Sequence, residues 1–403
     1  MLQIECIREL SSLDSIKNDW NRLSMGMTMR RPSWLMSWWE AYQESYRLCV
    51  LIARSEDKQV RGMMLLAETK NLLTGSTLVF MGSGKVCSDE QGILCERGYG
   101  MAVADAFANW LSNSSECKPW DNLNLDGIRS TDRVMQRFGQ TLCSKTQGII
   151  TYRPSPYCWK ASLDGGMETY FSRLSKRARR ILKNASAELV SGRSQFHVAE
   201  SLDEAQRLLP EISRIHQMRW KERGIDGCFT EKKFTTFLEK ATEALWDDPC
   251  ALHQDASTGI DMSLGNRVHI ATLQISGQTA AGAICFRDRN SLSVYLTGMN
   301  PEFAESKPGW QLLYGCIRHA ISLQCDSIDF LRGDEEYKGR LGAIPSMQQR
   351  WVVPSRRWLS KLRVATYLAA SEVKSWWQSP TIVNATNSAN TSATTTANSI
   401  DRT

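Results

Sequence analysis

The chain has 403 residues, of which 42% are hydrophobic and 23% are charged, and a formal net charge of +6. This length exceeds what one core usually holds, so we expect two domains of ordinary globular composition, and the modest positive charge suits anionic ligands without requiring a nucleic acid. Twelve cysteines without a C-x-x-C pair and five scattered histidines indicate reduced thiols in a cytoplasmic protein, with no metal site and no disulfide framework.

The N-terminal half shows alternating helix and strand patterns. The opening stretch MLQIECIREL carries charges among its apolar residues, so we expect no signal peptide, and no run of about 18 apolar residues predicts a transmembrane helix. Helices are expected over residues 13–23, 33–46 and 100–111, and strands over residues 48–53, 60–67, 77–81, 121–126 and 149–152. We interpret Trp34, Trp38 and Trp39 as core aromatics.

Proline and composition suggest the domain limits. Pro154-Ser155-Pro156 is the best linker in the sequence, and it predicts an N-terminal domain over residues 1–156 and a C-terminal domain over residues 157–377. Residues 378–403 are rich in Ser, Thr, Asn and Ala and hold almost no large apolar side chain, so we expect disorder there.

A basic helix is predicted early in the C-terminal domain. Residues 173–183 read RLSKRARRILK, with six positive charges and no negative one, and Ser175 can cap the helix. Arg177 and Arg180 lie away from its apolar stripe. They either form a solvated face or bind an anion, which could be a phosphate-bearing donor, an anionic acceptor or the acceptor stem of a tRNA.

A long amphipathic helix follows over residues 202–223. His216, Arg219 and Trp220 lie within about one turn of each other near its end, and His216 shares a face with Trp220. Such a helix end can line an acceptor pocket, although a structural histidine explains the same pattern.

The next elements predict a sheet that ends in a βαβ unit. After a helix over residues 229–246, strands are expected over residues 268–275, 280–286 and 291–299, as an antiparallel meander. A helix from Pro308 to about residue 323 and a strand over residues 327–331 complete the unit. Gly309 leaves the helix start uncovered, so several free N–H groups there predict an anion site formed by Lys307, Gly309, Trp310 and Gln311.

A polar cluster follows the last strand of this unit. Its members are Asp334, Glu335, Glu336, Tyr337, Lys338 and Arg340. Acids, a phenol and bases beyond a strand end suit proton-transfer chemistry, whereas the plain alternative is a solvated charged loop. Residues 347–353 predict a closing strand, and residues 355–377 predict a basic amphipathic helix that packs on the fold rather than binding a membrane.

Together these motifs resemble one family. The resemblance is carried by Tyr295, Gly298, Pro301, Lys307-Pro308-Gly309, the stretch DFLRGD from Asp329 to Asp334, Tyr337-Lys338, the LSKR of residues 174–177, Arg179-Arg180, His216, Arg219-Trp220, Gly224 and Phe229. The chain is similar to GNAT-type acetyltransferases of the CelD-like, cellulose-biosynthesis-associated group, which are related to the FemAB peptidyltransferases. The match is strongest over residues 160–345, and weaker matches occur at RPSW (31–34), Trp38-Trp39 and FMGSG (80–84).

This resemblance implies an α/β (α+β) fold of tandem GNAT-like units, each a mixed, mainly antiparallel sheet flanked by helices. It also implies an acyltransferase that moves an acetyl or other acyl group from acyl-CoA, a co-substrate rather than a permanent cofactor, to an amine or hydroxyl. Envelope or exopolysaccharide sugars are the implied acceptors. The longer glycine-rich pyrophosphate loop of ordinary GNAT enzymes is absent, and only Gly309 stands in its place.

The expected roles follow from the residues and the resemblance together. Asp334 or Glu335 would be the general base, Tyr337 would protonate the leaving thiolate, and Lys338 would give electrostatic support. Acceptor contacts would come from Arg177, Arg180, His216, Arg219 and Trp220. Two alternatives stay open: an aminoacyl-tRNA-dependent peptidyltransferase of FemAB type, or a non-catalytic protein that holds an anionic glycan or lipid-linked precursor.

Overall fold

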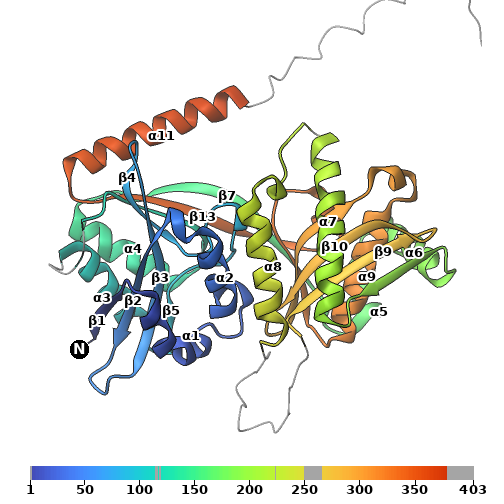
Figure 1. Ribbon diagram of the computed structural model, residues 1–403, viewed down its shortest axis with the longest axis horizontal. Coiled ribbons are helices and arrows are strands. Elements are labelled where there is room, and N and C mark those ends of the chain that lie inside the picture. The colour runs from blue at the N-terminus through green and yellow to red at the C-terminus, as the bar shows by residue number, and fades with distance from the viewer. Residues whose placement is uncertain (1, 114–116, 118, 223, 249–265, 379–403) are drawn as a thin grey trace, which may run out of the picture. The chain divides into compact units, whose positions relative to one another are not determined.

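The computed structural model describes residues 2–113, 117, 119–222, 224–248 and 266–378 (Figure 1). Residues 1–364 form one compact unit and residues 365–403 a second. The tail expected to be disordered lies, after Gln378, outside the described residues.

The strands are β1 (Gln3–Ile7), β2 (Arg47–Arg54), β3 (Val60–Asn71), β4 (Gly75–Phe80), β5 (Leu94–Cys95), β6 (Asn122–Arg129), β7 (Thr151–Ser162), β8 (Ser194–Val198), β9 (Val268–Ile275), β10 (Gln278–Arg287), β11 (Ser291–Met299), β12 (Ser327–Arg332) and β13 (Ile344–Pro354). The α-helices are α1 (Lys17–Leu23), α2 (Pro32–Tyr42), α3 (Gly100–Asn113), α4 (Arg133–Thr146), α5 (Gly166–Arg173), α6 (Lys176–Val190), α7 (Leu202–Glu222), α8 (Lys232–Trp246), α9 (Pro308–Ser322), α10 (Glu336–Arg340) and α11 (Trp358–Gln378). Short 3₁₀ helices lie at Leu10–Ile16, Thr28–Arg30, Gln43–Ser45, Gly84–Val86, Cys228–Thr230 and Pro301–Ser306.

The element order repeats. Residues 3–162 run strand, two helices, three strands, helix, strand, helix and strand, apart from the short β5. Residues 194–354 run through the same order, from β8 to β13. In each repeat the third strand of the meander and the strand after the next helix are parallel, as β4–β6 and β11–β12, while the other described pairs are antiparallel. The predicted tandem, mainly antiparallel fold is therefore confirmed.

The two repeats exchange their last strands within a single 13-stranded sheet. β7, which ends the first repeat, pairs with β12 of the second, and β13, which ends the second, pairs with β6 of the first. β7 and β13 pair with each other between them, in the middle of the sheet.

The predicted linker is therefore part of a strand. Ser155 pairs with Gln348, and Cys158 pairs with Ser346, on either side of Pro156. Two prolines close together in a sequence suggest a linker between domains. A strand accepts a proline, however, where its missing N–H is not needed for a hydrogen bond to the neighbouring strand. The predicted boundary between residues 156 and 157 falls inside β7.

Helices cover both faces of the sheet. In the second repeat α7 and α8 pack on one face, against alternate residues such as Ile270 and Ile284, and α5, α6 and α9 pack on the other, against Ala271 and Cys285 (Figure 1). In the first repeat α3, which holds the place of α9 in the element order, packs together with α4 on one face of the sheet.

The three predicted core tryptophans are confirmed as core. Trp34 and Trp38 are fully buried, and Trp39 is buried beside them. The Trp34 ring makes edge-on contacts with Phe237 and Phe286, at centroid distances of 4.8 Å and 5.0 Å, so α2 of the first repeat packs directly on α8 and β10 of the second.

Candidate active site

The site begins where two parallel strands separate. β11 and β12 pair only from Ser291–Ser327 to Ser293–Asp329. β12 then bends away, because Leu331 takes a left-handed conformation with φ 52° and the pairing with β7 shifts register there. Among the described residues, β11 continues to Met299 with no further β12 partner. Its inner edge is therefore open to a ligand that can pair with backbone N–H and C=O groups.

α9 starts at the mouth of this opening. Lys307 precedes the helix with φ 52°, Pro308 occupies its first position, and the Trp310 N–H is donated to the Lys307 carbonyl at 3.1 Å. Since proline has no N–H, the Gly309 N–H is the donor of this turn that lacks a partner among the described residues. The sequence predicted several such groups, and the Trp310 N–H is not one of them.

Gly309 has a packing role that the sequence does not reveal. A Cβ at this position would collide with the Met299 sulfur. The glycine therefore lets the start of α9 lie directly against the end of β11, which fixes the width of the opening between them.

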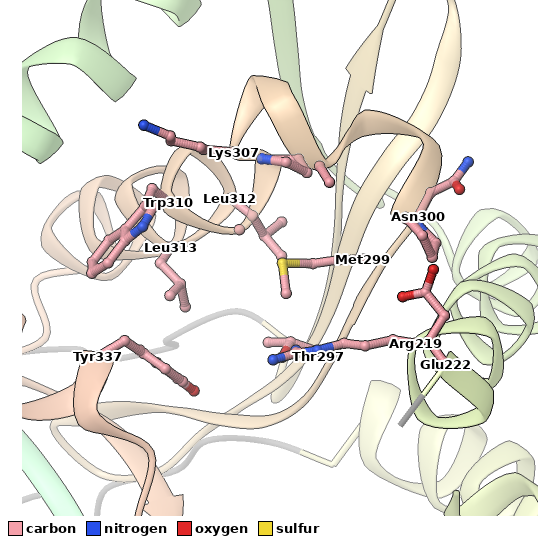
Figure 2. Close-up of a pocket in the computed structure, with 14 residues that line it drawn as sticks. Arg219, Glu222, Thr297, Met299, Asn300, Lys307, Trp310, Leu312, Leu313 and Tyr337 are labelled. Atoms are coloured by element: carbon pink, nitrogen blue, oxygen red, sulfur yellow. The ribbon is translucent and has the colours of Figure 1, made fainter. Parts of the chain in front are cut away.

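These elements enclose a cavity of about 370 Å³, a size that suits a small-molecule ligand. It is lined by Arg219, Glu222, Thr297, Met299, Asn300, Pro301, Ala304, Lys307, Pro308, Gly309, Trp310, Leu312, Leu313 and Tyr337. In Figure 2, Trp310 and Tyr337 lie on one side, Arg219 and Glu222 on the other, and Met299 lies between them. The predicted residues Arg219, Lys307, Gly309, Trp310 and Tyr337 thus meet in one place.

Tyr337 supplies the phenol of this cavity. It lies on the short helix α10, and its ring contacts Phe330 edge-on at 6.3 Å. Burial raises the pKa of Tyr337 well above its ordinary value, and the neighbouring Glu335 carboxylate raises the pKa further. The hydroxyl therefore stays protonated at neutral pH and can donate a proton or a hydrogen bond.

Glu222 supplies a carboxylate that the sequence interpretation missed. It stands one turn after Arg219 at the end of α7, and both side chains reach the cavity (Figure 2). The i, i+3 spacing from Arg219 was visible in the sequence, but it does not show which way the helix end points.

The carboxylates of the polar cluster, in contrast to Glu222, lie outside this cavity lining. Asp334 accepts the Tyr157 backbone N–H at 3.3 Å, and Glu335 pairs with the Lys338 ammonium at 2.9 Å. Lys338 is 2% exposed, and its ammonium also donates to the carbonyls of Leu331, Arg332 and Gly333. Lys338 therefore holds the bent end of β12 in place, which is a structural role.

His216 is held by its helix neighbour. It lies buried at 6% exposure, and its Nε2 accepts the indole N–H of Trp220 at 2.8 Å. Burial lowers the pKa of His216 to about 4, so the ring is neutral at physiological pH. Neither His216 nor Trp220 is among the cavity residues.

The basic helix lies on the other face of the sheet. α6, with Arg177 and Arg180 exposed on it, packs with α9, whereas α7 carries His216 on the opposite face. Arg177 and Arg180, which we expected to contact the acceptor together with His216, therefore lie on the opposite face of the sheet from it. The predicted Ser175 cap is confirmed, since its hydroxyl accepts the Ala178 N–H at 3.2 Å.

Gln311, predicted to contact the donor, is turned away from this cavity. It is buried, and its amide nitrogen donates to the Ser306 carbonyl at 2.8 Å. Within the described part of the chain, no group of three or more His, Cys, Asp or Glu side chains is arranged to hold a metal ion.

The parallel strands β11 and β12 separate around the start of α9, the helix that connects them. This arrangement defines the class of protein: the second repeat has a GNAT acyltransferase fold. Residues 175–339 match the family described as acetyltransferase (GNAT) domain. No curated protein sequence matches the chain.

Solved structures of similar fold cover nearly the whole chain. FemX is 10% identical, with a TM-score of 0.57 over 86% of this chain and 96% of FemX. A tandem GNAT protein from the clavulanic acid biosynthesis pathway is 11% identical, with a TM-score of 0.46 over 89% of this chain and 99% of that protein. At these identities the likeness concerns the fold alone.

Proposed function

We propose that this protein is an acyltransferase that binds its donor between β11 and the start of α9 and transfers the acyl group to an amine or hydroxyl. One observation carries the proposal: the cavity at the open edge of β11 brings a protonated phenol, Tyr337, and a carboxylate, Glu222, to face the same space. These are the groups that acyl transfer without a covalent enzyme intermediate requires.

Donor binding would use the backbone and one cation. The pantetheine arm of an acyl-CoA carries amide groups, which can pair with the free inner edge of β11 as an added strand does. The Gly309 N–H and the positive end of α9 favour an anionic group at the helix start, and Lys307 stands beside it.

In the chemical step the acceptor nitrogen or oxygen attacks the thioester carbonyl. Glu222 takes the proton that the acceptor loses, directly or through water. The carbon–sulfur bond breaks, and Tyr337 donates its proton to the departing thiolate. Arg219, beside Glu222, would orient an anionic part of the acceptor. Asp334 or Glu335, the bases expected from the sequence, would act only if the chain rearranged when substrates bind.

An aminoacyl-tRNA donor is the second candidate. Two observations favour it: only Gly309 stands where a longer glycine-rich pyrophosphate loop would lie, and α6 displays the exposed cations Lys176, Arg177, Arg180 and Lys183. Envelope or exopolysaccharide sugars are proposed acceptors on the resemblance to CelD-like proteins alone.

Two measurements test the proposal. Calorimetry with acetyl-CoA should show binding that Lys307→Asn weakens, and thiol release in the presence of a panel of amines and amino sugars should depend on Tyr337. Binding of a charged tRNA without acetyl-CoA binding would select the second donor. Binding of neither donor would overturn the proposal and leave a non-catalytic anion-binding protein.

A further inference from the structure

Three segments outside the candidate site together expose an apolar surface. They are the turn between β3 and β4, the loop between α4 and β7, and the first turns of α11. The apolar residues exposed there, which we call the apolar patch, are Leu72, Leu73, Ile149, Trp358, Leu359 and Leu362. Their exposed fractions are 97%, 80%, 79%, 76%, 38% and 55%.

Contacts beneath the patch hold these segments together. A Cβ on Gly75, at the base of the β3–β4 turn, would collide with the Arg363 guanidinium of α11. The Lys361 ammonium donates to the Gln147 carbonyl at 3.4 Å, next to Ile149. The three segments are therefore neighbours in one surface of the unit that ends at Val364.

The first turns of α11 pack on the fold mainly through polar side chains, although we expected an amphipathic helix there. Ser360 is fully buried, and its hydroxyl donates to Asp121 at 2.9 Å, while the Arg363 guanidinium donates to the same carboxylate at 2.9 Å. Val364 is buried one turn later. Leu359 and Leu362, by contrast, are exposed. A helix anchored by polar contacts that leaves its apolar side outside needs another surface to cover it.

The segments that form the patch also carry positive charge. The basic residues on them or next to them in the chain are Lys70, Lys145, Arg356, Arg357, Lys361 and Arg363. The carboxylates paired with them, Glu68 and Asp121, are both buried. Residues 355–371 contain four basic residues and no acidic one. A partner that covers this surface must therefore be apolar at its centre and anionic at its rim.

We infer that this surface docks the protein on an anionic lipid bilayer. The Leu72-Leu73 turn is a protruding tip, which a bilayer accepts without a complementary cavity. Trp358 on an amphipathic helix with lysine and arginine beside it is the composition of interfacial segments. Lipid phosphates satisfy the basic rim, since clustered Lys and Arg near an apolar surface bind anionic headgroups. Among the described helices, none combines the length and apolar content of a bilayer-spanning segment, so the contact is peripheral.

Vesicle co-sedimentation of the full chain tests this inference. Wild-type protein should sediment with vesicles that contain phosphatidylglycerol and remain in solution with pure phosphatidylcholine, and added salt should weaken the binding. The double variant Leu72→Ser/Leu73→Ser and the variant Trp358→Ser should each bind about tenfold more weakly, because apolar surface no longer enters the bilayer. Arg356→Glu/Lys361→Glu should lose the preference for anionic vesicles.

Val190→Ser is the matched control, since Val190 is 81% exposed at the end of α6, away from the patch. It should bind as wild type does. All substituted side chains are exposed, and circular dichroism checks that each variant is folded. Equal binding to both vesicle types, no binding to either, or an equal loss in Val190→Ser would overturn the inference. A change in oligomeric state by light scattering in Leu72→Ser/Leu73→Ser, with vesicle binding unchanged, would assign the patch to a second copy of the chain instead.

Discussion

The indole N–H of Trp220 donates to Nε2 of His216 at 2.8 Å, so the lone pair that a general base would use is already occupied. The proton of the neutral ring then lies on Nδ1, which faces the Gln217 side-chain oxygen at 3.4 Å. His216 thus positions the end of α7, and the chemistry of the site has to come from the residues beyond it.

The burial of His216 makes stability depend on pH. Burial lowers the pKa of folded His216 to about 4 from 6.5. Below the unfolded pKa the unfolded chain binds the proton more readily, so the contribution of neutral His216 is present above pH 6.5 and is lost as the pH falls toward 4. We expect a loss of up to about 3 kcal/mol. Chemical denaturation at neutral and mildly acidic pH should show this loss in wild type and a smaller one in His216→Gln. Identical pH profiles would contradict the assignment.

The base is tested by a pair of carboxamide variants. Glu222→Gln should slow acyl transfer about 10²–10⁴-fold while donor affinity stays unchanged, because only proton removal is lost. Asp334→Asn is the control, since Asp334 lies outside the cavity lining and accepts a backbone N–H. It should retain turnover within about threefold. The reverse pattern would return the base to Asp334, as the sequence suggested.

Tyr337→Phe should slow turnover less than Glu222→Gln does, since water can protonate a thiolate that is itself a good leaving group. Because the pKa of Tyr337 is raised by burial and by Glu335, the phenol keeps its proton through the alkaline range of an assay. The alkaline side of the pH–rate profile should therefore have the same shape in wild type and in Tyr337→Phe. A decline at alkaline pH in wild type that is absent from Tyr337→Phe would mean that the hydroxyl ionises within the assay range.

Donor binding is tested at Lys307. Lys307→Asn removes the cation and keeps a residue that tolerates the left-handed backbone, with φ 52°. We expect donor affinity to fall about tenfold or more by calorimetry, from the loss of one charge-assisted contact. Lys58→Asn is the matched control, because Lys58 is exposed and also left-handed, with φ 64°. Equal affinity in both variants would remove Lys307 from the donor site.

The packing of Gly309 on Met299 gives a rescue experiment. Gly309→Ala should lower the free energy of unfolding by about 1–3 kcal/mol, because the added methyl meets the Met299 sulfur. Adding Met299→Ala should recover part of that stability by making room. An acidic substitution at Gly309 would combine this clash with charge repulsion, so it cannot report on donor binding by itself. No recovery in the double variant would argue against the contact.

The sequence predicts local elements better than their partners in space. The βαβ unit was predicted correctly because Pro308 and the apolar stripe of α9 are local sequence signals. The helix cap at Ser175 was predicted correctly for the same reason. α4 was missed although its signal was present, because Asp132 accepts the N–H groups of Val134 and Met135 as an N-cap. β1 and β8 were also missed, as both are short.

The candidate site divides in the same way. Tyr337 and Lys307 were found because they border strong local signals. Glu222 was missed because its position depends on how the end of α7 sits over β11, a contact between segments far apart in the chain. Asp334 was expected to be a base and Lys338 to give electrostatic support, because the sequence cannot show that each already contacts a backbone group, of Tyr157 and Leu331 respectively. Charged residues beyond a strand end are ambiguous for that reason.

The exchange of β7 and β13 between the repeats has a consequence for biosynthesis. During translation the edge of β6 has no β13 beside it until residue 354 has left the ribosome, so the first repeat waits for almost the whole described chain. A polypeptide cut between the repeats would present unpaired edges on β6 and β12, which are templates for aggregation. Both repeats must therefore be synthesised before either one can complete its part of the sheet.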